Sequence, residues 1–74
     1  MTNLLFFKFN HRQHTFYILS EEYLTIWNYN RLIMANKVKI KGLKMGHIVD
    51  MIIDEESGSI LLVSEEDVFA IKMD

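Results

Sequence analysis

The 74-residue chain contains no cysteine and no proline, and only three of its residues are glycine. Without cysteine it has no disulfide, no thiolate zinc site and no cysteine nucleophile, although such groups support many domains of this size. No glycine-rich phosphate loop, serine-nucleophile motif or zinc-helix motif is present, so we expect no enzyme. Half of the residues are hydrophobic and 24% are charged, which excludes a disordered or low-complexity segment. One small domain is expected over residues 1–74.

Charge is divided unevenly along the chain. Residues 1–46 carry seven basic and two acidic side chains, whereas residues 47–74 carry one basic and eight acidic side chains. The two halves should therefore attract each other, or each should attract a partner of opposite charge. No apolar run approaches the roughly 18 residues of a membrane-spanning helix, and the apolar stretch Leu4–Phe9 lacks the features of a signal peptide. We expect a soluble intracellular chain, cytoplasmic by default, with no membrane attachment.

An internal repeat organises the sequence. Ser20-Glu21-Glu22 recurs as Ser64-Glu65-Glu66, at an offset of 44 residues. The same offset, extended without gaps, aligns apolar positions with apolar positions. The aligned pairs include Leu4 with Ile48, Phe7 with Met51, Phe16 with Ile60, Ile18 with Leu62, Leu24 with Val68 and Trp27 with Ile71. The offset divides the chain into copy one, residues 3–46, and copy two, residues 47–74.

Local patterns in both copies predict β-strands. Short apolar runs end in polar turns, and shorter apolar runs follow each turn. The predicted strands are Leu4–Phe9, Phe16–Leu19 and Tyr23–Tyr29 in copy one, and Ile48–Ile53, Ile60–Val63 and Val68–Met73 in copy two. A fourth strand at Lys37–Lys41 alternates lysine with apolar residues, which is typical of an exposed edge that resists pairing. The sequence thus predicts an all-β fold of antiparallel, four-stranded units.

Residues 21–35 also fit a helix. Ser20 could cap a helix that runs to Ala35, with two glutamates at its positive end. The β-branched residues, aromatic residues and asparagines of the segment favour a strand followed by a turn. We prefer the strand, and an α+β fold is the alternative.

Four-stranded units at a period near 44 resemble the blades of a WD-repeat β-propeller. Gly46-His47 stands where that family's glycine-histidine opens a repeat, and Met73-Asp74 stands where its tryptophan-aspartate closes one. In copy one, Ile26-Trp27-Asn28 occupies the closing position. The resemblance covers nearly the whole chain and implies one complete blade and three strands of another.

The resemblance also implies a buried hydrogen-bond chain in copy two. In the family this chain runs from the opening histidine through a serine or threonine to a turn aspartate and the tryptophan. The matching positions are His47, Ser64 and Asp67. Met73 replaces the terminal tryptophan, and copy one has Asn3 in place of the histidine. We therefore expect a weakened structural network.

A shorter stretch, Met45–Ile60, resembles the central hairpin of a PRC-type β-barrel. That resemblance makes a small autonomous β-barrel the second alternative. Closed propellers need about four to eight blades, so one and three-quarter blades cannot close a ring. We expect a protein partner, or further copies of this chain, to complete the sheet or ring.

Candidate metal ligands are incomplete. His11 and His14 lie three residues apart without a third ligand nearby, which is typical of solvated turn residues. Asp54–Glu65 has the length of a calcium-binding loop, but Gly58 stands where a side-chain ligand belongs and Ser59 replaces the glycine of the sharp bend. We expect an ordinary hairpin turn there, no metal and no cofactor.

A candidate interaction surface combines aromatic and basic side chains. Its members are Tyr23, Trp27, Tyr29, Lys37, Lys39 and Lys41. Aromatic rings beside lysines could stack on nucleic-acid bases, but the net charge of −2 makes nucleic acid unlikely as a partner. Packing against a neighbouring blade, with Trp27 as a buried anchor, is the preferred interpretation.

These observations favour a role in binding. WD-repeat propellers mostly serve as interaction platforms, so the resemblance implies a non-catalytic protein-protein interaction scaffold, or a subunit segment of a larger β-propeller assembly. The alternative is a small autonomous β-barrel or α+β regulator or adaptor, of viral or mobile-element origin.

Overall fold

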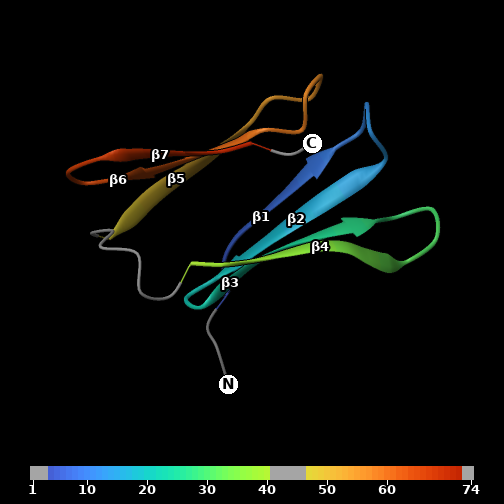
Figure 1. The fold of residues 1–74 in the computed structure, drawn as a ribbon, viewed down its shortest axis with the longest axis horizontal. Helices are drawn as coiled ribbons and strands as arrows, with labels where there is room; N and C mark the ends of the chain where they lie inside the picture. The colour runs from blue at the N-terminus through green and yellow to red at the C-terminus, as the bar shows by residue number, and fades with distance from the viewer. Residues whose placement is uncertain (1–3, 41–46, 73–74) are drawn as a thin grey trace.

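Two antiparallel sheets make up the computed structural model, which describes residues 4–40 and 47–72 (Figure 1). Sheet 1 consists of β1 (Leu4–Asn10), β2 (Thr15–Ser20), β3 (Tyr23–Asn28) and β4 (Ile33–Lys39), and sheet 2 consists of β5 (Ile48–Ile53), β6 (Ile60–Ser64) and β7 (Val68–Ile71). Every strand pairs only with its neighbours in sequence. The predicted all-β fold is confirmed. None of the described residues belongs to a helix that could span a membrane.

The alternative helix over residues 21–35 is wrong, because the segment forms β3, a turn and the start of β4. Asn28 explains the turn: its side-chain oxygen accepts hydrogen bonds from the backbone N–H groups of Asn30 and Arg31, at 3.0 and 3.1 Å. Asparagine makes such local bonds readily. The turn ends with Leu32 in the left-handed region, at φ 55°. β4 therefore begins at Ile33, four residues before the predicted start; Lys41 and Met73 lie outside the described residues.

The 44-residue offset holds in the pairing of the strands. In both copies the first described residue of the opening strand pairs with the serine of the Ser-Glu-Glu turn, and a shift of register follows. The equivalent pairs are Leu4 with Ser20 and Ile48 with Ser64, and the shifts lie at Leu4/Phe6 and Ile48/Asp50. The second and third strands match as well, since the pair Phe16 with Trp27 corresponds to Ile60 with Ile71. The two copies therefore share their registers and an irregularity in the same place.

The first turns of the two copies are also equivalent, and they touch. His14 and Gly58 lie 44 residues apart, and both have positive φ, at 57° and 79°. The Gln13 side chain of the first turn donates a hydrogen bond to the carbonyl of Glu56 in the second, at 2.7 Å. Arg12 pairs with the carboxylate of the same glutamate at 3.3 Å, although both side chains are exposed. A side-chain to backbone hydrogen bond and an ion pair thus join the two sheets at one end.

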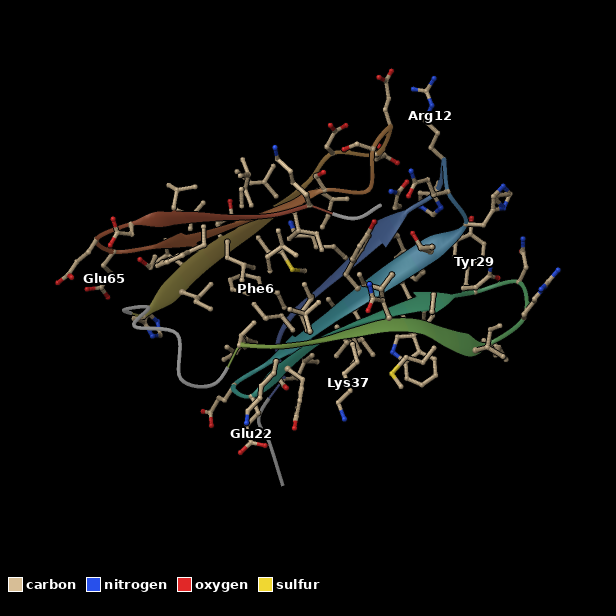
Figure 2. The ribbon with its side chains drawn as sticks, in the orientation of Figure 1. Phe6, Arg12, Glu22, Tyr29, Lys37 and Glu65 are labelled. Atoms are coloured by element: carbon tan, nitrogen blue, oxygen red, sulfur yellow. The ribbon has the colours of Figure 1, made fainter. Side chains whose placement is uncertain are left out.

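One hydrophobic core lies between the sheets. Its buried members are Tyr17, Leu19, Leu24, Ile26 and Ile40 from the sheet 1 side, and Met51, Ile60 and Leu62 from sheet 2. Phe6 packs against this cluster from β1 and lies between the sheets (Figure 2). The sheets come closest at β1 and β5, which lie side by side in Figure 1, while β4 and β7 form the outer edges. The fully buried Asn10 is satisfied, because it donates to the Tyr17 hydroxyl at 3.1 Å.

We expect Gly58→Ala to lower the free energy of unfolding by about 1 to 2 kcal/mol, because a Cβ atom is disfavoured at this φ. An added Cβ would also lie 2.6 Å from the Gln13 side-chain oxygen. Gly58→Ala in a Gln13→Ala background separates the backbone strain from the clash with Gln13. If the backbone strain is responsible, the loss in the free energy of unfolding persists in that background. Denaturant unfolding measures both, and an unchanged free energy in both backgrounds would contradict the assignment.

Acid sensitivity is expected at the second turn. The Asp54 carboxylate accepts hydrogen bonds from the Ser57 hydroxyl at 2.9 Å and the Glu56 N–H at 3.1 Å, and these hold the pKa of Asp54 below its ordinary value of 3.8. The folded state therefore binds this proton less tightly than the unfolded chain does. The contribution of Asp54 to stability is complete above about pH 4 and is lost as the pH falls through the folded-state pKa. Asp54→Asn should unfold with a shallower acid dependence than the wild type, whereas the exposed neighbour substitution Glu55→Gln should not.

Candidate interaction surface

The outer face of sheet 1 carries a row of aromatic side chains. Residues that pair directly across strands project to the same face of a sheet. The register therefore places Phe9, Phe16, Trp27 and Met34 in one row across all four strands, with Phe7 and Ile18 in the next. We call these six residues the aromatic face. Phe7, Phe9 and Met34 are 45 to 49% exposed.

The rings of the aromatic face contact one another. Phe16 lies at its centre, stacked on Phe7 with ring centroids 5.3 Å apart and on Trp27 at 6.0 Å. Phe9 meets Phe7 edge to face at 5.1 Å. The Trp27 indole N–H donates to the Thr25 hydroxyl at 3.1 Å, so its polar atom is satisfied within the sheet. The aromatic face therefore offers a partner a largely apolar surface of packed rings, bordered by Thr25 and Lys37, which continue the row of Phe7 and Ile18.

The outer face of sheet 2 is largely apolar and carries no rings, although it includes Asp50, which pairs with Val63. The pairs Ile52 with Leu61, Leu61 with Ala70, and Val63 with Val68 place these five residues together. We call them the aliphatic face. Ile52, Leu61 and Val68 are 48, 40 and 61% exposed.

The two copies do not bury equivalent faces. The buried residues Tyr17, Leu19, Leu24 and Ile26 of copy one have as counterparts Leu61, Val63, Val68 and Ala70, which lie in the aliphatic face. The buried residues Met51, Ile60 and Leu62 of copy two have as counterparts Phe7, Phe16 and Ile18, which lie in the aromatic face. A two-fold symmetric sandwich would bury the same positions in both copies. The sheets are instead stacked head to tail, and each copy leaves uncovered the face that the other copy buries.

The residues of the predicted interaction surface are brought together only in part. Tyr23 pairs with Lys39, and the Lys37 ammonium lies 4.1 Å from the centre of the Tyr23 ring. Tyr29 lies beyond the other end of β3, well apart from Lys37 in Figure 2. Trp27 is half-buried and stacked on Phe16, whereas the sequence analysis expected it to be buried against a neighbouring blade.

Sequence reasoning missed Phe7, Phe9 and Phe16 as surface residues. Their runs are apolar at nearly every position, so alternation of polarity does not show which side faces the core. The signal that could have found them is the repeat. Where the two copies bury different faces, a residue that is buried in one copy has an exposed counterpart 44 residues away in the other.

Ser64 and Asp67 contact each other through the backbone of Asp67. The Ser64 hydroxyl donates to the Asp67 carbonyl at 3.0 Å and accepts from the Asp67 N–H at 2.9 Å. Ser20 makes the same two bonds with Tyr23, so this arrangement does not need a carboxylate. His47 enters the turn through its carbonyl, which accepts from the N–H of the residue after Ser64 at 3.2 Å. The expectation of a buried imidazole is wrong, because His47 is exposed. The hydrogen-bond chain through the side chains of His47, Ser64 and Asp67, called here the side-chain relay, stays a prediction.

The remaining polar groups of the described residues include the candidates for metal binding and acid-base chemistry. Within residues 4–40 and 47–72, no group of three or more His, Cys, Asp or Glu side chains comes together. His11 stacks on Phe9, and the Nδ1 atom of His14 lies 3.1 Å from the Asn30 amide. A cavity of about 160 Å³ is lined by the first turns of both copies and by sheet 1. Its wall includes the buried Thr15 hydroxyl, which has no hydrogen-bond partner, but no acid-base pair.

Comparisons with protein-family models, with curated proteins and with solved structures find no match to this chain. The two outer faces are therefore the features from which a function can be inferred.

We expect Ser64→Ala to lower the free energy of unfolding by about 1 to 2 kcal/mol, because the backbone N–H groups of Asp67 and Glu66 lose the hydroxyl that accepts their hydrogen bonds. Asp67→Ala should cost much less, since the bonds of Asp67 come from its backbone. Ser20→Ala serves as the matched variant in copy one. If Asp67→Ala costs as much as Ser64→Ala in denaturant unfolding, its carboxylate takes part after all and the predicted side-chain relay gains support.

Proposed function

We propose that this chain is a non-catalytic, propeller-type segment that binds other protein chains through its aromatic and aliphatic faces. The observation that carries the proposal is the head-to-tail stacking of the two copies. The contact between the sheets buries one face of each copy, and the opposite face of each copy is apolar and uncovered. Both kinds of face already serve as packing surfaces within the chain.

The exposure of these faces favours a partner. Small monomeric proteins seldom present a contiguous apolar patch across a whole sheet. Here the uncovered patches include Phe9 at 49% and Val68 at 61% exposure, on opposite sides of the molecule's two layers. The turns, by contrast, carry most of the acidic residues, as at Asp54–Glu56 and Glu65–Asp67. Apolar faces separated by charged turns are typical of a module that is covered on both sides.

Two features support a blade-like arrangement. The first strands of the copies, β1 and β5, approach each other most closely, as the inner strands of neighbouring blades do. Sheet 2 has one strand fewer than sheet 1, so β7 presents an edge of four residues, Val68–Ile71, without a charged side chain. The corresponding edge strand of sheet 1 carries Lys37 and Lys39, which discourage edge pairing.

Solution mass tests the proposal. At tens of micromolar the wild-type chain should have a mass above 8.8 kDa by light scattering, because its outer faces associate. The double substitution Ile52→Glu and Val68→Glu on the aliphatic face should lower that mass. Both residues are exposed, so the free energy of unfolding should change by no more than about 1 kcal/mol.

The substitution Glu55→Gln, in a turn that belongs to neither face, is the control and should keep the wild-type mass. A wild-type chain that is a sharp 8.8 kDa monomer with a cooperative melting transition would contradict the proposal. That result would favour the alternative of a small autonomous regulator or adaptor.

A further inference from the structure

We propose that the aromatic face binds the aliphatic face of a second copy of this chain, so that copies stack head to tail and close into a ring. This inference rests on the proposed function and adds the identity of the partner. The contact between the two sheets inside the chain is the template. The inner face of sheet 1 uses the same repeat positions as the aliphatic face, and the inner face of sheet 2 uses the same repeat positions as the aromatic face. These two inner faces pack together. Repeating the same stacking operation brings the aliphatic face of one chain onto the aromatic face of the next.

The sizes of the side chains support this pairing. Each of four aliphatic-face residues is smaller than its buried counterpart: Leu61 stands for Tyr17, Val63 for Leu19, Val68 for Leu24 and Ala70 for Ile26. Four aromatic-face residues are larger than their counterparts in or against the core: Phe7 stands for Met51, Phe9 for Ile53, Phe16 for Ile60 and Trp27 for Ile71. Because protein interfaces pack at nearly constant density, a face that has lost volume fits a face that has gained it.

Charge selects the same orientation. The aromatic face belongs to copy one, in which basic residues outnumber acidic residues by seven to two, and the aliphatic face belongs to copy two, in which acidic residues outnumber basic residues by eight to one. Head-to-tail contact therefore brings opposite charges together. Contact between two aromatic faces, or between two aliphatic faces, would bring together halves of the same sign, which is unfavourable.

Contacts between unlike faces either close into a ring or grow without limit. Each chain contributes two repeats, so a ring of about four to eight blades contains about two to four copies. The expected wild-type species is one discrete assembly with a mass of about 18 to 35 kDa, given a chain mass of 8.8 kDa.

Complementation between two face variants tests the inference. The aromatic-face variant carries Phe7→Glu and Phe9→Glu, and the aliphatic-face variant carries Ile52→Glu and Val68→Glu; all four positions are 45 to 61% exposed. Each variant alone retains one working face and should be an 8.8 kDa monomer. Mixed in equal amounts, they should form a one-to-one dimer of about 18 kDa, because only one compatible pair of faces remains and no ring can close. Trp27 is retained in both variants, so its fluorescence should shift to shorter wavelength on mixing.

The outcomes separate this inference from the proposed function. If the aliphatic-face variant alone still dimerises but has a lower mass than the wild type, like faces meet and the inference is wrong, while the proposed function stands. If the wild type associates but the mixture stays monomeric, the head-to-tail pairing is equally excluded. If the wild type is a monomer, or if both variants keep the wild-type mass, the proposed function fails as well.

Circular dichroism of each variant checks that the strands are retained. Should the double aromatic-face variant fail to fold, Met34→Glu replaces it, because Met34 lies in the same face on an edge strand and is 46% exposed. A dimer with the aliphatic-face variant is expected again, and its absence would overturn the inference.

Discussion

The contact between unlike faces of the two repeats holds the molecule together. Tyr17, Leu19 and Leu24 pack with Met51, Ile60 and Leu62 into a single layer from which water is excluded, and each of these side chains is at most 1% exposed. Short antiparallel meanders have no core of their own, because both faces of an isolated sheet meet solvent. The contact between the sheets therefore supplies the buried core, and the orientation in which they meet decides which residues remain outside.

Polar contacts link the sheets at one end and close equivalent turns within each sheet at the other. The first turns of both copies have one left-handed residue at the same position, and their contact runs from the Gln13 amide to a backbone carbonyl. At the other end, a serine hydroxyl closes the second turn of each copy in the same way. Because these bonds involve backbone groups, the repeat tolerates different side chains at Tyr23 and Asp67 while the geometry stays the same.

The sequence predicts the strands because apolar runs and turn residues can be read in windows of a few residues. It predicts the repeat because short segments 44 residues apart can be compared directly. It does not predict which face is buried, since Leu4–Asn10 and Ile48–Ile53 are apolar on both sides and burial depends on how the sheets stack. The start of β4 was misplaced for a related reason, because Asn28 ends β3 through its own side chain, whereas the lysine alternation marks only the later part of β4. The recurrence of Ser20 at Ser64 marks the turn, but it does not show that the hydroxyl of each serine bonds to the backbone.

The sequential order of the strands has a consequence for how the molecule folds. Within each sheet every strand pairs with the next strand in sequence, so both meanders can form quickly from short loop closures. Sheet stacking follows, and until then four apolar faces are open instead of two. During that time the aliphatic face and the inner face of sheet 1 can both pack on the inner face of a sheet 2. Under the head-to-tail pairing proposed above, the local concentration of chains during synthesis would influence whether the first stacked pair lies within one chain or between two.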